Sequence, residues 1–88
     1  FTMIHPNPFS SSVLLKFSTP TTSTVGLSIY NIRGQRVREF EFPGVPGAEH
    51  ALQWDGLDSQ GDSCPSGVYW AVLQIGETKH IRKLTLSK

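Results

Sequence analysis

The sequence predicts one small all-β domain over residues 1–88, built as an antiparallel sandwich of about six to seven short strands. Two observations support this prediction. Apolar and polar residues alternate with a period of two, and turn-forming residues interrupt the alternation about every 8 to 12 residues, as in small sandwiches. No long stretch shows the periodicity of a helix, so we expect strands throughout.

The composition agrees with a turn-rich β domain. The 88 residues are 38% hydrophobic and 17% charged, with a net charge of +1, and a chain of this size has little room for a deep pocket. The eight Lys and Arg residues are spread along the chain, so we expect no nucleic-acid partner. No apolar run approaches the ~18 residues of a membrane span and no signal peptide is present. Because Phe1 is not Met, we expect a domain cut from a longer secreted precursor.

The first strands follow from alternation and turns. Apolar residues occupy one face at Val13, Leu15 and Phe17, and one face again at Val25, Leu27 and Ile29. Gly34 predicts a hairpin turn with a return strand over residues 36–42. Pro43 and Pro46 predict a loop, because proline cannot donate a ladder hydrogen bond. Residues 50–54 then predict a strand with Leu52 and Trp54 on one face, followed by a long turn region.

Residues 67–75 predict a strand of a different kind. Both of its faces are apolar, so we expect it to be central or covered on both sides; one face holds Val68, Trp70 and Val72, and the other holds Tyr69, Ala71, Leu73 and Ile75. Gly76 turns the chain into a last strand, where Leu84 and Leu86 alternate correctly and Ile81 is out of phase, which suggests a β-bulge. The result is an immunoglobulin-like sandwich whose terminal hairpin is pinned into the core.

Catalytic motifs are absent. The chain has no nucleophile elbow, no zinc-protease helix motif and no phosphate-binding glycine loop, so we predict no enzymatic activity. We expect His5, His50 and His80 to lie on the surface, because they are scattered and none pairs at metal-ligand spacing. Cys64 is the single cysteine and lies in a turn without an activating neighbour, which predicts an inert thiol.

Three aspartates, Asp55, Asp58 and Asp62, raise the question of calcium. Counting from Asp58, the sixth position is Ser63 and the twelfth is Tyr69, so the spacing of a calcium-binding EF-hand loop is not met. Asp side chains also cap turns, and this interpretation is favoured, with a loop calcium site as the alternative. We expect no cofactor.

Trp54 and Trp70 raise the question of carbohydrate binding, since aromatic faces suit flat apolar ligands. At an alternating strand position Trp54 is expected in the core. A sugar platform would use Trp70 and Tyr69, but these two alternate to opposite faces of one strand. A carbohydrate-binding module therefore ranks last among the non-catalytic interpretations.

Three segments, in this order, resemble a known family. They are Pro6, Asn7 and Pro8; Gly67, Val68 and Tyr69; and the tail with Lys83, Leu84, Leu86 and Lys88. Over nearly the whole chain the sequence resembles the type A C-terminal sorting domain of the type IX secretion system. Residues 54–69 also resemble the Ig-like domain of flagellar hook-capping proteins. Thr85 and Ser87 depart from the more apolar tails of the sorting family.

The resemblance implies a non-catalytic signal. Such a domain follows a secreted cargo on the same chain, is recognised in the periplasm by shuttle proteins and an outer-membrane translocon, and is usually removed by a sortase-like peptidase. The cargo then reaches the cell surface or is secreted. A terminal edge strand with Lys83 and Lys88 suits strand pairing and charged anchoring with a partner.

Simpler interpretations stay open. Pro6 and Pro8 can fix an extended segment before the first strand, Gly67 can ease a turn, Tyr69 can be a core aromatic, and the lysines can be solubilising. The alternative function is an Ig-like accessory domain that packs on a neighbouring domain and stabilises it.

Overall fold

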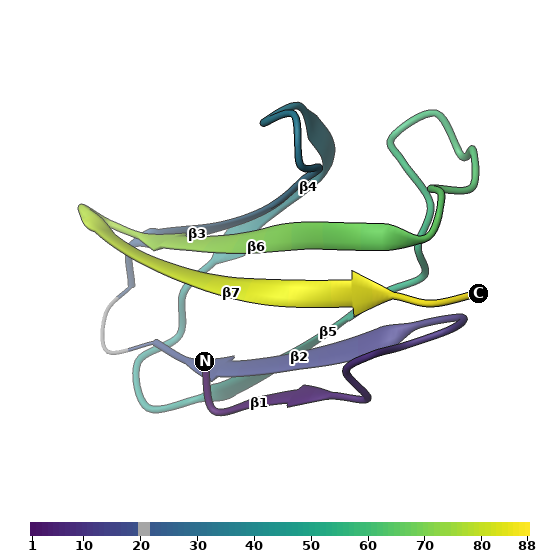
Figure 1. Cartoon of the computed structure of the whole chain (residues 1–88). Helices are drawn as coiled ribbons and strands as arrows, with labels where there is room; N and C mark the ends of the chain where they lie inside the picture. The colour runs from purple at the N-terminus through teal and green to yellow at the C-terminus, as the bar shows by residue number, and fades with distance from the viewer. Residues whose placement is uncertain (20–21) are drawn as a thin grey trace.

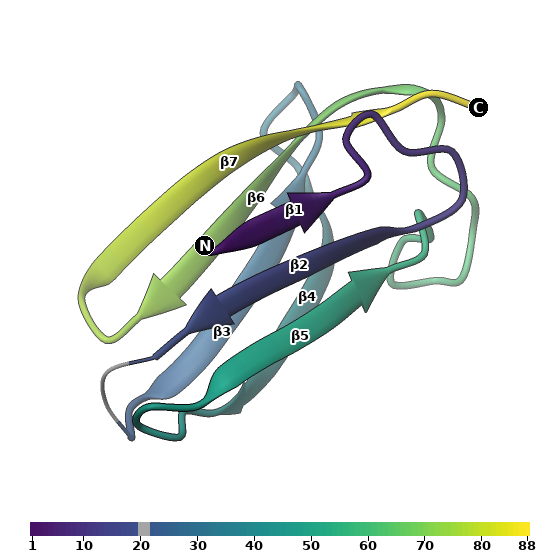
Figure 2. The ribbon, with the colours of Figure 1, turned by 90° about the horizontal axis from the view of Figure 1, so that it is seen from below.

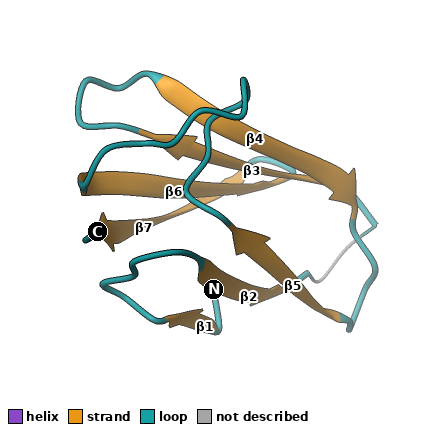
Figure 3. Cartoon of the chain, turned by 90° about the vertical axis from the view of Figure 1, so that its right-hand side faces the viewer, coloured by secondary structure: helices purple, strands orange, loops and turns teal. Residues whose placement is uncertain are grey.

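The computed structural model describes residues 1–19 and 22–88, and it contains two antiparallel sheets packed face to face (Figures 1 and 3). The strands are β1 (Met3–His5), β2 (Val13–Ser18), β3 (Thr24–Tyr30), β4 (Arg36–Pro43), β5 (Glu49–Trp54), β6 (Gly67–Ile75) and β7 (Thr78–Leu86). One sheet has the order β1-β2-β5 and the other has the order β4-β3-β6-β7. The all-β sandwich expected from the sequence is confirmed.

The core lies between the sheets and follows the alternation of the sequence. The inward side chains of β2 (Val13, Leu15, Phe17) and of β3 (Val25, Leu27, Ile29) are all fully buried. Each such side chain stabilises the fold by about 1.5–3 kcal/mol through apolar burial. The face assignments made for these strands are therefore confirmed.

Trp54, at the end of β5, is the largest fully buried side chain. Its ring centroid lies 5.6 Å from that of Phe9 and 5.4 Å from that of Tyr69. The indole Nε1–H donates a hydrogen bond of 2.9 Å to the carbonyl of Leu57, so the one polar atom of this ring is satisfied. The core position expected for Trp54 is confirmed.

The turn between β3 and β4 forms as expected at Gly34, which has a φ of 78°. The carboxamide oxygen of Asn31 accepts hydrogen bonds of 3.0 Å from the backbone N–H groups of Arg33 and Gln35. Beyond the turn, β4 extends one residue further than expected and ends at Pro43. Proline is tolerated there because β4 is an edge strand.

β6 lies between β3 and β7, so the prediction of a central strand is confirmed. Its outer face is nevertheless uncovered, and Trp70 on that face is 39% exposed. The bulge expected at Ile81 was wrong. The ladder between β6 and β7 is regular, with Val72 opposite Ile81, and Ile81 is out of phase because its side chain lies on the outer face, 54% exposed.

β1 was not expected from the sequence. It is three residues long and only Ile4 is half-buried, so the alternation is too short to recognise. Its partner is β2, with Ile4 opposite Leu15 (Figure 2).

Candidate functional site at the end of β7

The three segments singled out in the sequence meet at the carboxyl end of β7. On one side β7 pairs with the start of β6, where Gly67 lies opposite Leu86 and Tyr69 lies opposite Leu84. On its other side lies the segment between β1 and β2, which runs beside the end of β7 in Figures 1 and 2. The tail is therefore held from both sides.

Asn7 makes the closest connection on this second side. Its carboxamide nitrogen donates a hydrogen bond of 2.9 Å to the carbonyl of Lys83, and its carboxamide oxygen accepts one of 2.9 Å from the N–H of Thr85. A carboxamide presents one donor group and one acceptor, like a peptide unit, so Asn7 replaces a neighbouring strand here. The peptide bonds before Pro6 and Pro8 are both cis.

Phe9 continues this contact with its backbone. Its N–H donates to the carbonyl of Thr85 at 2.9 Å, and its carbonyl accepts from the N–H of Ser87 at 2.8 Å. The Phe9 ring is buried against Trp54. Sequence reasoning missed both Asn7 as a bonding residue and Phe9 as an anchor, because their hydrogen-bond partners lie more than seventy residues away.

β7 is an edge strand, but only part of its edge is open. Thr85 and Ser87 direct their N–H groups away from β6, toward Asn7 and Phe9. Antiparallel pairing alternates, so Lys79, Ile81 and Lys83 also direct their N–H groups away from β6. The Ile81 carbonyl accepts a hydrogen bond of 2.9 Å from the Arg82 guanidinium. The open part of the edge over residues 79–83 therefore presents the N–H groups of Lys79, Ile81 and Lys83, while the carbonyls of Ile81 and Lys83 already accept side-chain hydrogen bonds.

The tail side chains divide into two groups. Leu84 and Leu86 are buried in the core, whereas Lys83 and Lys88 are exposed. The Lys88 ammonium donates to the Ser63 hydroxyl and the Cys64 carbonyl, and the Lys88 N–H donates to the Ser66 hydroxyl at 3.0 Å. Lys88 thus caps the loop before β6, while the Lys83 side chain lies on the outer face opposite Trp70.

Tyr69 occupies the core position that the simpler interpretation anticipated. It is buried, and its hydroxyl donates a hydrogen bond of 2.6 Å to the carbonyl of Pro65. Burial, followed by the neighbouring Cys64, raises the pKa of Tyr69. Gly67 has a φ of 154° at the start of β6, and Val68 is half-buried on the outer face.

The Cys64 thiol lies in the same corner of the molecule and is buried. Burial and then the charge of Asp58 raise its pKa, so the group is a protonated thiol at neutral pH.

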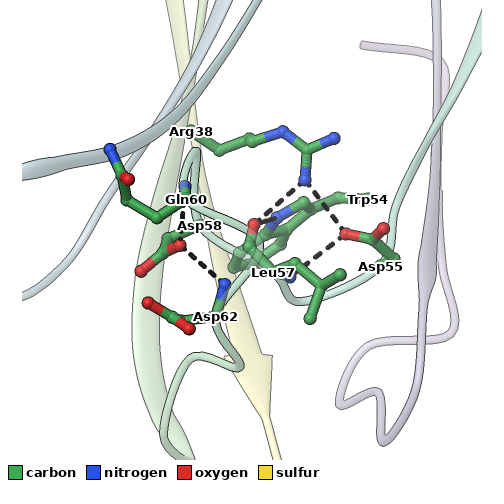
Figure 4. A network of polar contacts seen from close by, with 7 residues as sticks. All are labelled: Arg38, Trp54, Asp55, Leu57, Asp58, Gln60 and Asp62. Atoms are coloured by element: carbon green, nitrogen blue, oxygen red, sulfur yellow. Dashed lines mark hydrogen bonds and ion pairs between the residues drawn. The ribbon is translucent and has the colours of Figure 1, made fainter.

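The carboxylates of Asp55 and Asp58 organise the loop before β6, and Asp62 takes part through its backbone (Figure 4). Asp58 accepts hydrogen bonds of 2.9 Å from the N–H groups of Gln60 and Asp62. Asp55 accepts from the N–H of Leu57 at 3.1 Å and from the Arg38 guanidinium at 3.0 Å. Slight burial alone would raise the pKa of Asp55, but these two hydrogen bonds and the charge of Arg38 lower it overall.

These bonds have the turn-capping geometry that was favoured. Within residues 1–19 and 22–88, no group of three or more His, Cys, Asp or Glu side chains is arranged to hold a metal ion.

Two of the three histidines differ from the surface positions expected. His5 is exposed, but His50 is half-buried, with ring centroids 5.5 Å from Phe17 and 5.3 Å from Phe42. The expectation for His50 was wrong because it shares the inner face of β5 with Trp54. His80 is also half-buried, since it lies in phase with the inward Leu84.

Comparison with known proteins identifies the fold family. The model of the FlgD Ig-like domain matches residues 9–76. The chain belongs to this family of immunoglobulin-like domains. It is also 39% identical over 59 residues to the interleukin-21 receptor of Mus musculus, which covers 67% of this chain and 10% of the receptor. The chain thus spans about a tenth of the length of that receptor. No solved structure matches this chain.

The family match leaves out both ends of the chain. Residues 1–8, which contain Asn7, and residues 77–88, which contain Lys83 and Lys88, lie outside residues 9–76. These two ends are the segments that the Asn7 carboxamide joins. The described part of the chain contains no helix that is long and apolar enough to cross a membrane.

Proposed function

We propose that this FlgD-like Ig domain is a non-catalytic C-terminal signal that directs an upstream cargo across the outer membrane through the type IX secretion system. Its partners are then shuttle proteins and the translocon, and a sortase-like peptidase removes it afterwards. The observation that supports the proposal is the junction of Asn7 with Lys83 and Thr85. Two segments outside the family match, each of which resembles a sorting-domain motif, meet at this junction.

This surface suits recognition by a large partner. It is built from an open strand edge at residues 79–83 and the exposed lysine Lys83 beside it. Backbone groups of an open edge accept a partner strand, and a nearby ammonium group adds charge selectivity. Asn7 fixes the backbone of Lys83 and Thr85 through two hydrogen bonds, so the proposed signal is a folded surface rather than a flexible tail.

The test is the location of the cargo in the native host. The full-length protein would carry Lys83→Ala or Asn7→Ala, with Arg33→Ala as the control, an exposed basic residue in the β3–β4 turn and outside the proposed surface. Point substitutions are preferable to deletion of the tail, since deletion removes the buried Leu84 and Leu86. Cell fractionation should show cargo retained in the periplasm for the first two variants and exported for the control.

Normal export of both variants would overturn the proposal, as would retention of all three variants alike. The alternative, an accessory domain that stabilises its neighbour, has one supporting observation. Ile32 is 76% exposed beside a mainly apolar hollow of about 330 Å³ that also includes Val37 and Val68. That function predicts normal location but a lower melting temperature of the neighbouring domain when residues 1–88 are removed.

A further inference from the structure

The outer face of the β4-β3-β6-β7 sheet carries a groove of about 350 Å³. β3 forms its floor, because the side chains there are small. Residues of β4 and β6 form its two walls. The floor consists of Gly26 and Ser28, and the walls consist of Glu39 and Glu41 on one side and Val72 and Gln74 on the other.

Gly26 is the unusual residue of this groove. A glycine inside a strand costs about 0.5–1 kcal/mol relative to alanine. A Cβ atom at this position would meet nothing within 4 Å, and the one register shift of β3 against β4 lies further on, between Ile29 and Tyr30. Neither crowding nor a bulge requires the glycine. Glycines inside strands are also found where a ligand or another backbone approaches closely.

Two aromatic residues on neighbouring strands lie on the outer face at one end of the groove. Tyr30 lines the groove and lies directly opposite Trp70 on β6. Tyr30 is half-buried and Trp70 is exposed, and both are on the outer face. The aromatic residue that shares the outer face with Trp70 at the same register position is thus Tyr30 on the neighbouring strand, whereas Tyr69 is buried in the core.

The charges along the groove balance. Arg36 and Lys79 are basic, Glu39 and Glu41 are acidic, and Arg36 forms an ion pair of 2.8 Å with Glu39. Carboxylate, amide and hydroxyl groups provide many hydrogen-bonding positions without net charge. This lining disfavours an acidic polymer and suits the hydroxyl groups of an uncharged sugar, with aromatic rings for its apolar face.

We propose that the groove over Gly26, together with the Tyr30–Trp70 pair, binds a neutral glycan. This proposal does not rest on the proposed export signal, because the groove shares no residue with the Asn7 junction, and Lys79 is the one groove residue that also belongs to the open edge of β7.

The test is binding of the labelled chain to an array of neutral and acidic glycans, followed by titration of the ¹⁵N-labelled chain with the neutral oligosaccharides that bind. We expect binding to neutral glycans, with shifts of the amide signals of Gly26, Ser28 and Gln74. Tyr30→Ala and Trp70→Ala should each weaken binding about tenfold by removing a stacking ring. Met3→Ala, which changes an exposed apolar residue of the other sheet, should leave binding unchanged.

Gly26→Val separates binding from folding. Valine fits the open space and favours a strand, so the melting temperature should stay the same or rise while the filled groove loses glycan binding. Intact binding in Gly26→Val would overturn the proposal, as would binding to acidic glycans alone or to no glycan. Should the valine variant unfold, Tyr30→Ala with a normal melting temperature decides the question.

Discussion

Asn7 and Asp58 use similar side-chain chemistry over very different distances in the sequence. Asp58 accepts two hydrogen bonds of 2.9 Å from residues two and four positions further along the chain. Asn7 makes two hydrogen bonds of 2.9 Å with residues 76 and 78 positions away. The first pair organises one loop, while the second joins opposite ends of the chain.

This difference in sequence separation determines how far each region depends on the whole fold. The Asp58 turn needs only its own short segment, because donor and acceptor are neighbours in the sequence. The Asn7 junction exists only when β1, β2 and β7 are all in place. A change that loosens the sandwich should therefore affect the Asn7 region first, and four predictions address the two regions.

The largest effect is expected for Trp54→Ala, since Trp54 lies between the two regions. The substitution removes contacts with Phe9 beside the junction and the hydrogen bond to Leu57 in the aspartate loop. Loss of a fully buried Trp should reduce the free energy of unfolding by about 3–5 kcal/mol. Urea denaturation measures it, and a loss below about 1 kcal/mol would contradict the assignment of Trp54 as the central core residue.

An intermediate effect is expected for Asn7→Ala. Two exposed hydrogen bonds are lost, so the free energy of unfolding should fall by about 1–2 kcal/mol. Amide exchange should accelerate at Thr85 and Ser87. Asn7→Asp keeps the oxygen that accepts from the N–H of Thr85, so its free energy of unfolding should fall by less than that of Asn7→Ala.

Asp58→Ala is the counterpart of this experiment. Its faster amide exchange should be confined to the loop, at Gln60 and Asp62, with the N–H of Thr85 unchanged. If amide exchange accelerated throughout the sandwich to the same extent in Asn7→Ala and Asp58→Ala, the contrast between a long-range and a local contact would be contradicted.

The smallest effect concerns pH and Asp55. Its pKa is lowered in the folded state, so its contribution to stability is present above the unfolded value of about 3.9 and is lost as the pH falls through and below about 4. The contribution is small, because the side chain is about half exposed and solvent screens its pairing with Arg38. Asp55→Asn should flatten the acid limb of stability against pH, measured by thermal unfolding. Gln60→Ala, which changes an exposed uncharged side chain of the same loop, is the control and should leave that limb unchanged.

Sequence reasoning succeeded where the information was periodic or local. Alternation placed Val13, Leu15 and Phe17 correctly, and Gly34 marked its turn. It failed at Ile81, where a shift of phase suggested a bulge although the residue simply faces outward. It also missed β1, because three residues contain too little alternation to recognise.

The sites were harder to predict than the strands. The segments around Asn7, Gly67 and Lys83 were identified separately by resemblance, yet nothing local in the sequence indicates that they meet. Similarly, the sequence suggested Tyr69 as a second ring for a sugar platform with Trp70. The ladder between β3 and β6 instead places Tyr30 opposite Trp70. Such juxtapositions depend on the register of strands that are distant in sequence.

By itself the sequence determined the all-β class, most of the strands and the inward faces of the core, since these follow from a period of two and from turn chemistry. The tertiary structure alone decided which half of β7 is open, which aromatic ring accompanies Trp70, and where the Asn7 carboxamide finds its partners. Hydrogen bonds and packing across long separations form only when the whole chain has folded, so no local pattern of residues encodes them.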